Sequence, residues 1–149
     1  MAVALVVAAC GSRATPLTHA QYEKQVNAAG QNLTTQLQNV FSKVGGSSTR
    51  KGLAAAASTV RKAADVIDGQ ADSLHELAAP ADAAPANDKL VDGLHLLAAA
   101  LRGFATVAEK SDLPKVQAFV AEAKSQAIPG EEQIAAAIND LKKAGYQVS

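Results

Sequence analysis

A pattern of aspartate followed three residues later by histidine occurs twice, at Asp72 and His75 and again at Asp92 and His95. Helical bundles that hold two metal ions use a related glutamate–histidine pair, together with two further inward glutamates. The helical period argues against such a site here, because His75 lies roughly 60° and His95 roughly 130° from the apolar face of its helix. Asp92 is also on the outer side. We therefore expect no metal site, and we interpret these histidines as boundary or surface residues.

Four carboxylates form an acidic stripe along one helix face: Asp65, Asp68, Asp72 and Glu76. They lie roughly 125° from the apolar seam of that helix. The stripe is interpreted as a solvated face; the alternatives are a docking site for a cationic partner or a weak calcium site. Calcium needs about six to eight converging oxygens, which a straight helix cannot present. Arg61 is expected to pair with Asp65, and His19 is expected at the surface.

The composition offers no basis for catalysis or nucleic-acid binding. The chain has 14 basic and 14 acidic residues, and aromatic residues make up 3% of it, so the basic surplus needed for phosphate contacts is missing. Neither a nucleophile-elbow motif nor a Cys-x-x-Cys-His motif occurs, and the pattern places no serine, histidine and carboxylate together in a cleft. We therefore expect a protein that is not an enzyme, has no cofactor and does not bind nucleic acid.

The only cysteine, Cys10, follows an apolar N-terminal run. The segment Val7-Ala8-Ala9-Cys10 resembles the lipobox of bacterial lipoproteins. The resemblance implies a signal peptide at residues 1–9, cleavage between Ala9 and Cys10, and a diacylglyceryl group on Cys10 that anchors an extracytoplasmic protein to a bacterial membrane. The run lacks Lys and Arg and is short, which a signal peptide missing its first residues would explain. The alternative is a frayed apolar terminus with an incidental cysteine.

The rest of the chain resembles small, alanine-rich helical lipoproteins of uncharacterised function, through the segments 74–80 and 90–94. With its cysteine lipidated, the domain would fold without a disulfide, by core packing alone. No stretch after Cys10 is expected to be apolar enough to span a membrane.

Apolar residues recur at helical spacing along four segments. The first runs over 18–44, where Thr18 and Gln21 form a capping box, and the second over 50–79, where large apolar residues alternate with alanines in heptads. A loop at 80–85 precedes a third helix at 86–110. In the last segment the apolar phase continues through Pro129, which predicts one helix over 113–144, kinked at that proline. These elements predict an all-α fold: an up-down-up-down four-helix bundle over residues 18–146, joined to Cys10 by a tether at 10–17.

This topology predicts which end of the bundle faces the membrane. Residues 11–17 span about 25 Å at most, so the loop at 80–85 would lie on the membrane side. A protein partner would then meet the opposite, basic end, which carries Lys43, Arg50, Lys51, Lys110 and Lys115.

Two functions remain open for such a bundle. The first is a non-enzymatic, lipid-anchored interaction or structural module at the cell surface. The alternative is a carrier of an apolar small ligand between helices, in a cleft left by small residues such as Gly30, Gly69, Gly103 and Gly130. A pocket of about 300 Å³ or more would favour the carrier.

Overall fold

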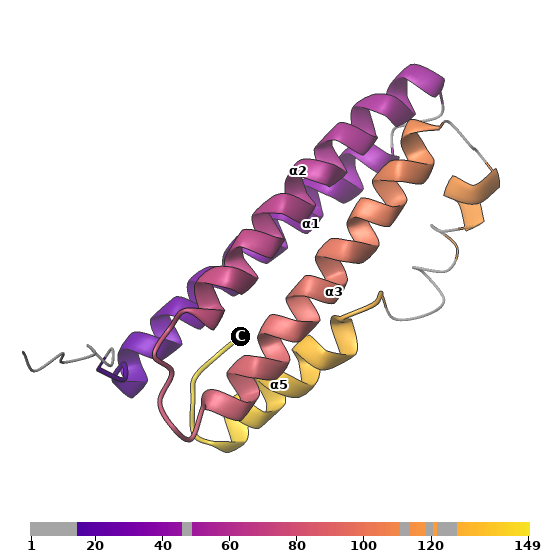
Figure 1. Cartoon of the computed structure of the whole chain (residues 1–149). Helices are drawn as coiled ribbons and strands as arrows, with labels where there is room; N and C mark the ends of the chain where they lie inside the picture. Colours follow the sequence, from indigo (N-terminus) through magenta and orange to yellow (C-terminus); the bar gives the residue numbers. More distant parts are fainter. Residues whose placement is uncertain (1–14, 46–48, 111–113, 119–120, 122–127) are drawn as a thin grey trace, which may run out of the picture.

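A computed structural model describes residues 15–45, 49–110, 114–118, 121 and 128–149. Within these ranges the protein is all-helical, as predicted. Its helices are α1 (His19–Gly45), α2 (Arg50–His75), α3 (Ala84–Glu109) and α5 (Glu131–Lys143), with a further helical stretch at 114–118. Helix α2 runs antiparallel to α1, and α3 runs antiparallel to α2. The shorter α5 lies along one half of α3 (Figure 1).

Local capping fixes the beginnings of α1 and α2. The backbone N–H of Thr18 donates to Gln21 Oε1 at 2.9 Å, and the N–H of Gln21 donates back to Thr18 Oγ1 at 3.3 Å. This reciprocal pair is the predicted capping box. Thr49, which the sequence argument overlooked, caps α2 by accepting the Gly52 N–H at 3.1 Å.

The boundaries of α2 and α3 differ from the prediction by a few residues. Helix α2 ends at His75 rather than residue 79, and the N–H of Glu76 closes its last turn by donating to the Asp72 carbonyl at 3.0 Å. Helix α3 begins at Ala84, so Pro85 lies in its first turn and not in the loop. Proline is tolerated there because the first N–H groups of a helix have no partner within it.

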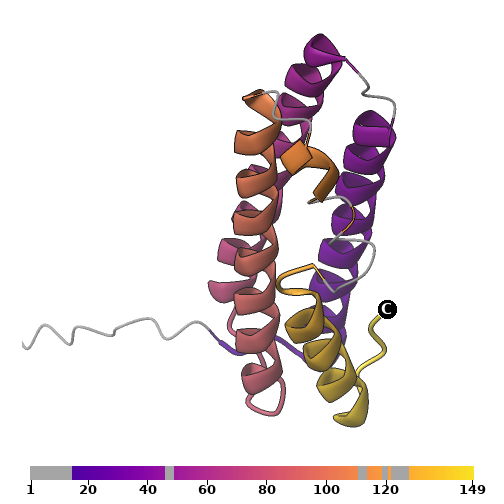
Figure 2. The same cartoon turned by 90° about the vertical axis from the view of Figure 1, so that its right-hand side faces the viewer.

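The predicted seams form the core. On α2, Leu53, Val60, Ile67 and the seam alanines Ala57, Ala64 and Ala71 are at most 3% exposed, and the leucines predicted on α3 are at most 5% exposed. Backbone contacts join α1 to α2, α2 to α3 and α3 to α5. Among the described helices, α1 and α5 make no such contact with each other. Residues 146–149, which follow α5, lie against α1 instead (Figure 2).

The prediction of one kinked helix over 113–144 is wrong. Pro129 and Gly130 form a turn, and Gly130 has a φ of 92°, in the left-handed region that ends regular helix. Beyond the turn, α5 packs on α3. Positions 119, 120 and 122–127 lie outside the described residues.

Helix α3 is long and apolar enough, by length and composition alone, to cross a membrane. The expectation that no segment after Cys10 has this character is therefore wrong. Half of its most apolar window is buried inside the protein, as for a core helix with neighbours on two sides.

Candidate functional site

The predicted lipidation and cleavage residues, Cys10 and Ala9, lie outside the described residues. The structure does show where the chain that follows them joins the helices. The N–H of Leu17 donates to the carbonyl of Ala78 at 2.8 Å, and the Leu17 side chain packs against the core. The chain thus enters the helical body beside the α2–α3 loop, at the end where α5 also terminates (Figure 1).

Two buried tyrosines meet at this end. Tyr22 donates its hydroxyl proton to Asn87 Oδ1 at 2.9 Å, and Asn87 Nδ2 donates to the Leu74 carbonyl at 3.1 Å, near the end of α2. Tyr146 packs edge-on against Tyr22, with ring centroids 5.5 Å apart, and donates to Asp82 Oδ1 at 2.9 Å. These residues form a tyrosine cluster that joins α1, the α2–α3 loop, α3 and the chain after α5.

Sequence reasoning missed the central member of this cluster. Asn87 is 3% exposed and is the only buried polar residue in the described part of the chain. It lies three residues before Leu90, on the apolar face of α3. A polar side chain on an apolar face needs a hydrogen-bond partner, and this position was the available signal.

The tyrosine cluster gives a spectroscopic prediction. Burial is the largest cause that raises the pKa values of Tyr22 and Tyr146 to about 12, and the hydrogen bond to Asp82 is the next cause for Tyr146. Below about pH 10 the raised pKa values of the two tyrosines contribute fully to the stability of the folded protein. Between about pH 10 and 12 the unfolded chain loses its phenolic protons while the folded chain keeps them, so stability falls as pH rises. We expect an absorbance titration at 295 nm to show both tyrosines ionising near pH 12 in the folded protein and near pH 10 in urea. A step near pH 10 in the folded protein would contradict the burial.

Residues 146–149, here called the strap, run back along α1. The N–H of Gln147 donates to Glu23 Oε1 at 2.6 Å. The Asn27 amide then holds two strap residues: its Nδ2 donates to the Gln147 carbonyl at 2.8 Å, and its Oδ1 accepts the Ser149 N–H at 3.0 Å. Side chains of α1 thus satisfy backbone groups of the strap that have no regular secondary structure to pair with.

An apolar cavity of about 230 Å³ lies between α1, α3 and α5, beside the strap. Most of its lining is aliphatic, and the rest is small or hydroxyl-bearing: Val26, Ala29, Gly30, Leu33, Thr34, Leu74, Leu90, Leu94, Ile134, Ile138 and Ser149. Of the four glycines expected to open a cleft, Gly30 lines this cavity. Gly69 and Gly103 are exposed, with no atom near enough to touch an added Cβ. Gly130 lies against the backbone of Gly93 and so closes a helix contact instead.

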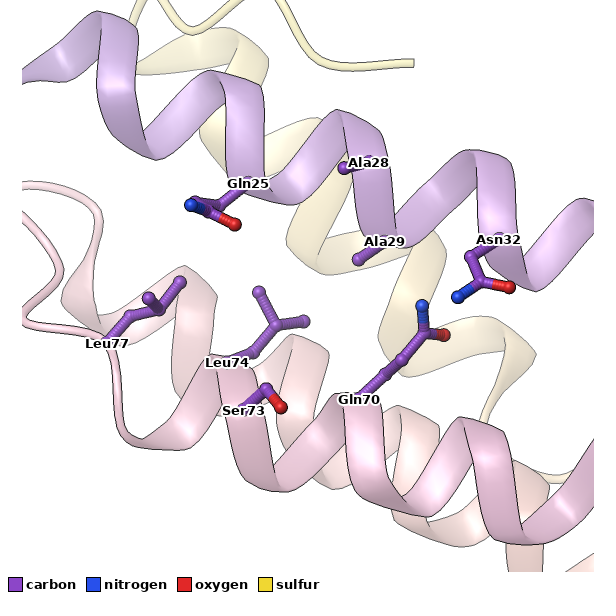
Figure 3. Close-up of a pocket in the computed structure, with 8 residues that line it drawn as sticks. All are labelled: Gln25, Ala28, Ala29, Asn32, Gln70, Ser73, Leu74 and Leu77. Carbon is purple, nitrogen blue, oxygen red and sulfur yellow. The ribbon is translucent and has the colours of Figure 1, made fainter.

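A second recess, of about 260 Å³, lies between α1 and α2, and its lining is more polar than that of the first cavity. Figure 3 shows the amides of Gln25, Asn32 and Gln70 around it, with Leu74 and Leu77 along its α2 side. Both volumes are larger than the almost zero volume expected if the helices packed without a pocket. Both are smaller than the roughly 300 Å³ of a drug-sized site.

The acidic stripe is not simply a solvated face. Arg102 of α3 contacts Asp65 Oδ1 and Asp68 Oδ2, each at 2.9 Å, and His95 Nδ1 lies 2.7 Å from Asp68 Oδ1. The hydrogen bonds from His95 and Arg102 hold the pKa of Asp68 below its usual value. The predicted pairing of Arg61 with Asp65 is wrong, because Arg61 pairs with Glu109 at 2.8 Å. Asp65 and Asp68 therefore join α2 to α3, while Asp65, Asp72 and Glu76 are exposed as the interpretation of a solvated face predicted.

The predicted positions of the histidines are partly right. His75 and Asp92 are exposed, and the described residues contain no group of three or more potential metal ligands. His19 is at the surface, with a half-exposed side chain 3.3 Å from Glu23, but its ring also stacks on Tyr146 at 3.6 Å. His95 lies at the α2–α3 boundary and does not point away from it.

The basic residues fall at the opposite end of the molecule, as the topology predicted. Lys43 lies in the last turn of α1, Lys51 is the second residue of α2 and Lys110 follows α3, while Lys115 lies in the helical stretch at 114–118.

Comparisons with protein-family models, with curated proteins and with solved structures found no match to this chain.

Proposed function

We propose that this protein is a four-helix bundle held at a bacterial membrane by a lipid on Cys10, where it acts as a non-enzymatic interaction or structural module. The proposal takes residues 1–9 as the signal peptide and residues 10–17 as the tether. Its basis in the sequence is the lipobox resemblance of Val7 to Cys10. The module is expected to be extracytoplasmic, with the membrane as one partner and an unidentified protein as the other.

One structural observation carries the orientation of the module. The hydrogen bond from Leu17 to Ala78 fixes the start of the described chain to the α2–α3 loop. A tether over 11–17 spans about 25 Å at most. An anchored Cys10 would therefore hold this end, with its tyrosine cluster and strap, close to the membrane surface. The end with Lys43, Lys51 and Lys110 would face away from the membrane, toward a protein partner.

The experiment is an intact-mass measurement on protein expressed in a bacterial host with the native or a restored N-terminus. Loss of residues 1–9 with a diacylglyceryl or triacyl increment on Cys10 is expected. Cys10→Ser is the matched control: it is expected to keep its leader and to carry no lipid increment. An unmodified wild-type chain that retains Met1 would contradict the proposal.

The protein-partner part of the proposal is tested by charge reversal at Lys51 and Lys110. Loss of a cross-linked partner is expected from these changes. The carboxylates of the acidic stripe are unsuitable controls because they pair with α3, so the exposed Lys24 on α1 is the better one. Partner capture that survives reversal of Lys51 and Lys110 would overturn the assignment of this face.

The alternative function is a carrier that binds an apolar small ligand between the helices. The aliphatic cavity beside Gly30 favours it. An engineered apolar cavity of about 150 Å³ binds benzene, so a cavity of about 230 Å³ is large enough for a small apolar ligand. Lipid anchoring and ligand binding are compatible, and each has its own readout.

A further inference from the structure

The cavity between α1, α3 and α5 has a lining that defines the chemistry of a ligand. The side chains of its described lining residues carry no charge and no aromatic ring. Aliphatic walls favour an aliphatic chain, whose burial is favourable in proportion to the apolar area removed from water. The hydroxyls of Thr34 and Ser149 are the polar side-chain groups among these residues.

The charges beside the strap disfavour an anionic head group. Glu23 is the acidic residue that holds Gln147, and the described lining supplies no cation to pair with a carboxylate. An unpaired carboxylate would have to leave water next to another carboxylate, which is costly. A neutral hydroxyl or ester head, which the hydroxyl of Thr34 can meet, fits better.

The strap is close to the α1 backbone at this cavity. A Cβ added to Gly30 would lie 3.2 Å from the backbone oxygen of Ser149. The absence of a side chain at Gly30 therefore lets the strap lie close to α1. Ser149 itself lines the cavity. Asn27 holds it through its N–H at 3.0 Å and its hydroxyl at 3.2 Å.

We propose that the cavity binds a neutral aliphatic chain and that the strap, held by Asn27, controls access to it. This inference rests on the alternative carrier function. Binding requires the strap to move away from α1. The apparent affinity is then reduced by the fraction of molecules in which the strap is closed.

The test is a titration of the protein with 1-octanol, followed by the amide NMR shifts of Gly30 and Ile134, which report on the cavity. Asn27→Ala removes three hydrogen bonds from the strap, and we expect it to tighten the octanol Kd about three- to tenfold. Asn32→Ala, an exposed amide on the same helix, is the matched control and is expected to leave the Kd unchanged. Octanoate is expected to bind at least about tenfold more weakly than octanol.

A cavity-filling change locates the ligand. Ile138→Phe is expected to weaken octanol binding at least about tenfold, and Leu33→Phe serves if circular dichroism shows the first variant to be unfolded. An equal Kd in wild type and Asn27→Ala would overturn control by the strap and leave the carrier function standing. Absence of octanol shifts in both would overturn the ligand site and the carrier function together. Neither result bears on the lipid at Cys10, which the mass measurement tests separately.

Discussion

Replacing Tyr22 by alanine is expected to lower the free energy of unfolding by about 3–5 kcal/mol. Tyr22 is fully buried, so truncation leaves a ring-sized cavity beside Tyr146. It also leaves Asn87 Oδ1 buried without its donor, which adds a desolvation cost. Urea denaturation followed by far-ultraviolet circular dichroism measures the change.

Two further variants separate the ring from its hydroxyl. Tyr22→Phe keeps the ring and is expected to cost about 1–2 kcal/mol, since only the hydrogen bond to Asn87 is lost. Lys24→Ala, at an exposed position on the same helix, is expected to change stability by less than about 0.5 kcal/mol. A Tyr22→Ala variant no less stable than Tyr22→Phe would show that this end of the protein is not packed as described.

Gly130→Ala is expected to destabilise the protein by about 2–5 kcal/mol. Gly130 has a φ of 92°, and a residue with a Cβ costs roughly 1–2 kcal/mol in this conformation. The added Cβ would also overlap the carbonyl oxygen of Gly93 on α3 and lie 2.9 Å from the N–H nitrogen of Leu97. Relieving that overlap forces α5 away from α3, at a further cost of about 1–3 kcal/mol.

Gly103→Ala is the matched control for Gly130→Ala. Gly103 is in the interior of α3, is exposed, and has no atom within 4 Å of an added Cβ. Alanine there is expected to stabilise the protein by about 0.5–1 kcal/mol through its higher helix propensity. Hydrogen exchange adds a local readout: Gly130→Ala should raise the exchange rates of α5 amides more than those of α2. Equal stability of the two variants would contradict the close contact of Gly130 with Gly93.

Residue spacing alone located the helices and their buried faces with few errors. The heptads of α2 and the leucines of α3 were predicted as core and are buried, because their alternation every three or four residues reflects a single side of a helix. The capping box of Thr18 and Gln21 was equally predictable, since its partners are three residues apart. Helix ends were less predictable: α2 ends at His75, four residues before the predicted end at residue 79.

The candidate sites depended on residues distant in sequence. Asp68 was placed on a solvated face by its angle from the seam, yet it meets His95 and Arg102. The angle describes one helix in isolation and contains nothing about the width of the neighbouring helix or the reach of an arginine side chain. The strap could not be predicted either, because Ser149 and Asn27 are separated by 122 positions and no local pattern links them.

The sequence by itself determined the all-helical class, the buried faces of α1, α2 and α3, and the cysteine whose lipidation we propose. Each of these follows from interactions within a few residues, where propensity, capping and periodicity act. The tertiary structure decided the turn at Gly130, the pairing of the acidic stripe with α3, the tyrosine cluster around Asn87 and the strap beside the apolar cavity. These depend on how close two packed helices come and on which buried polar groups must find partners, and only the folded chain brings those groups together.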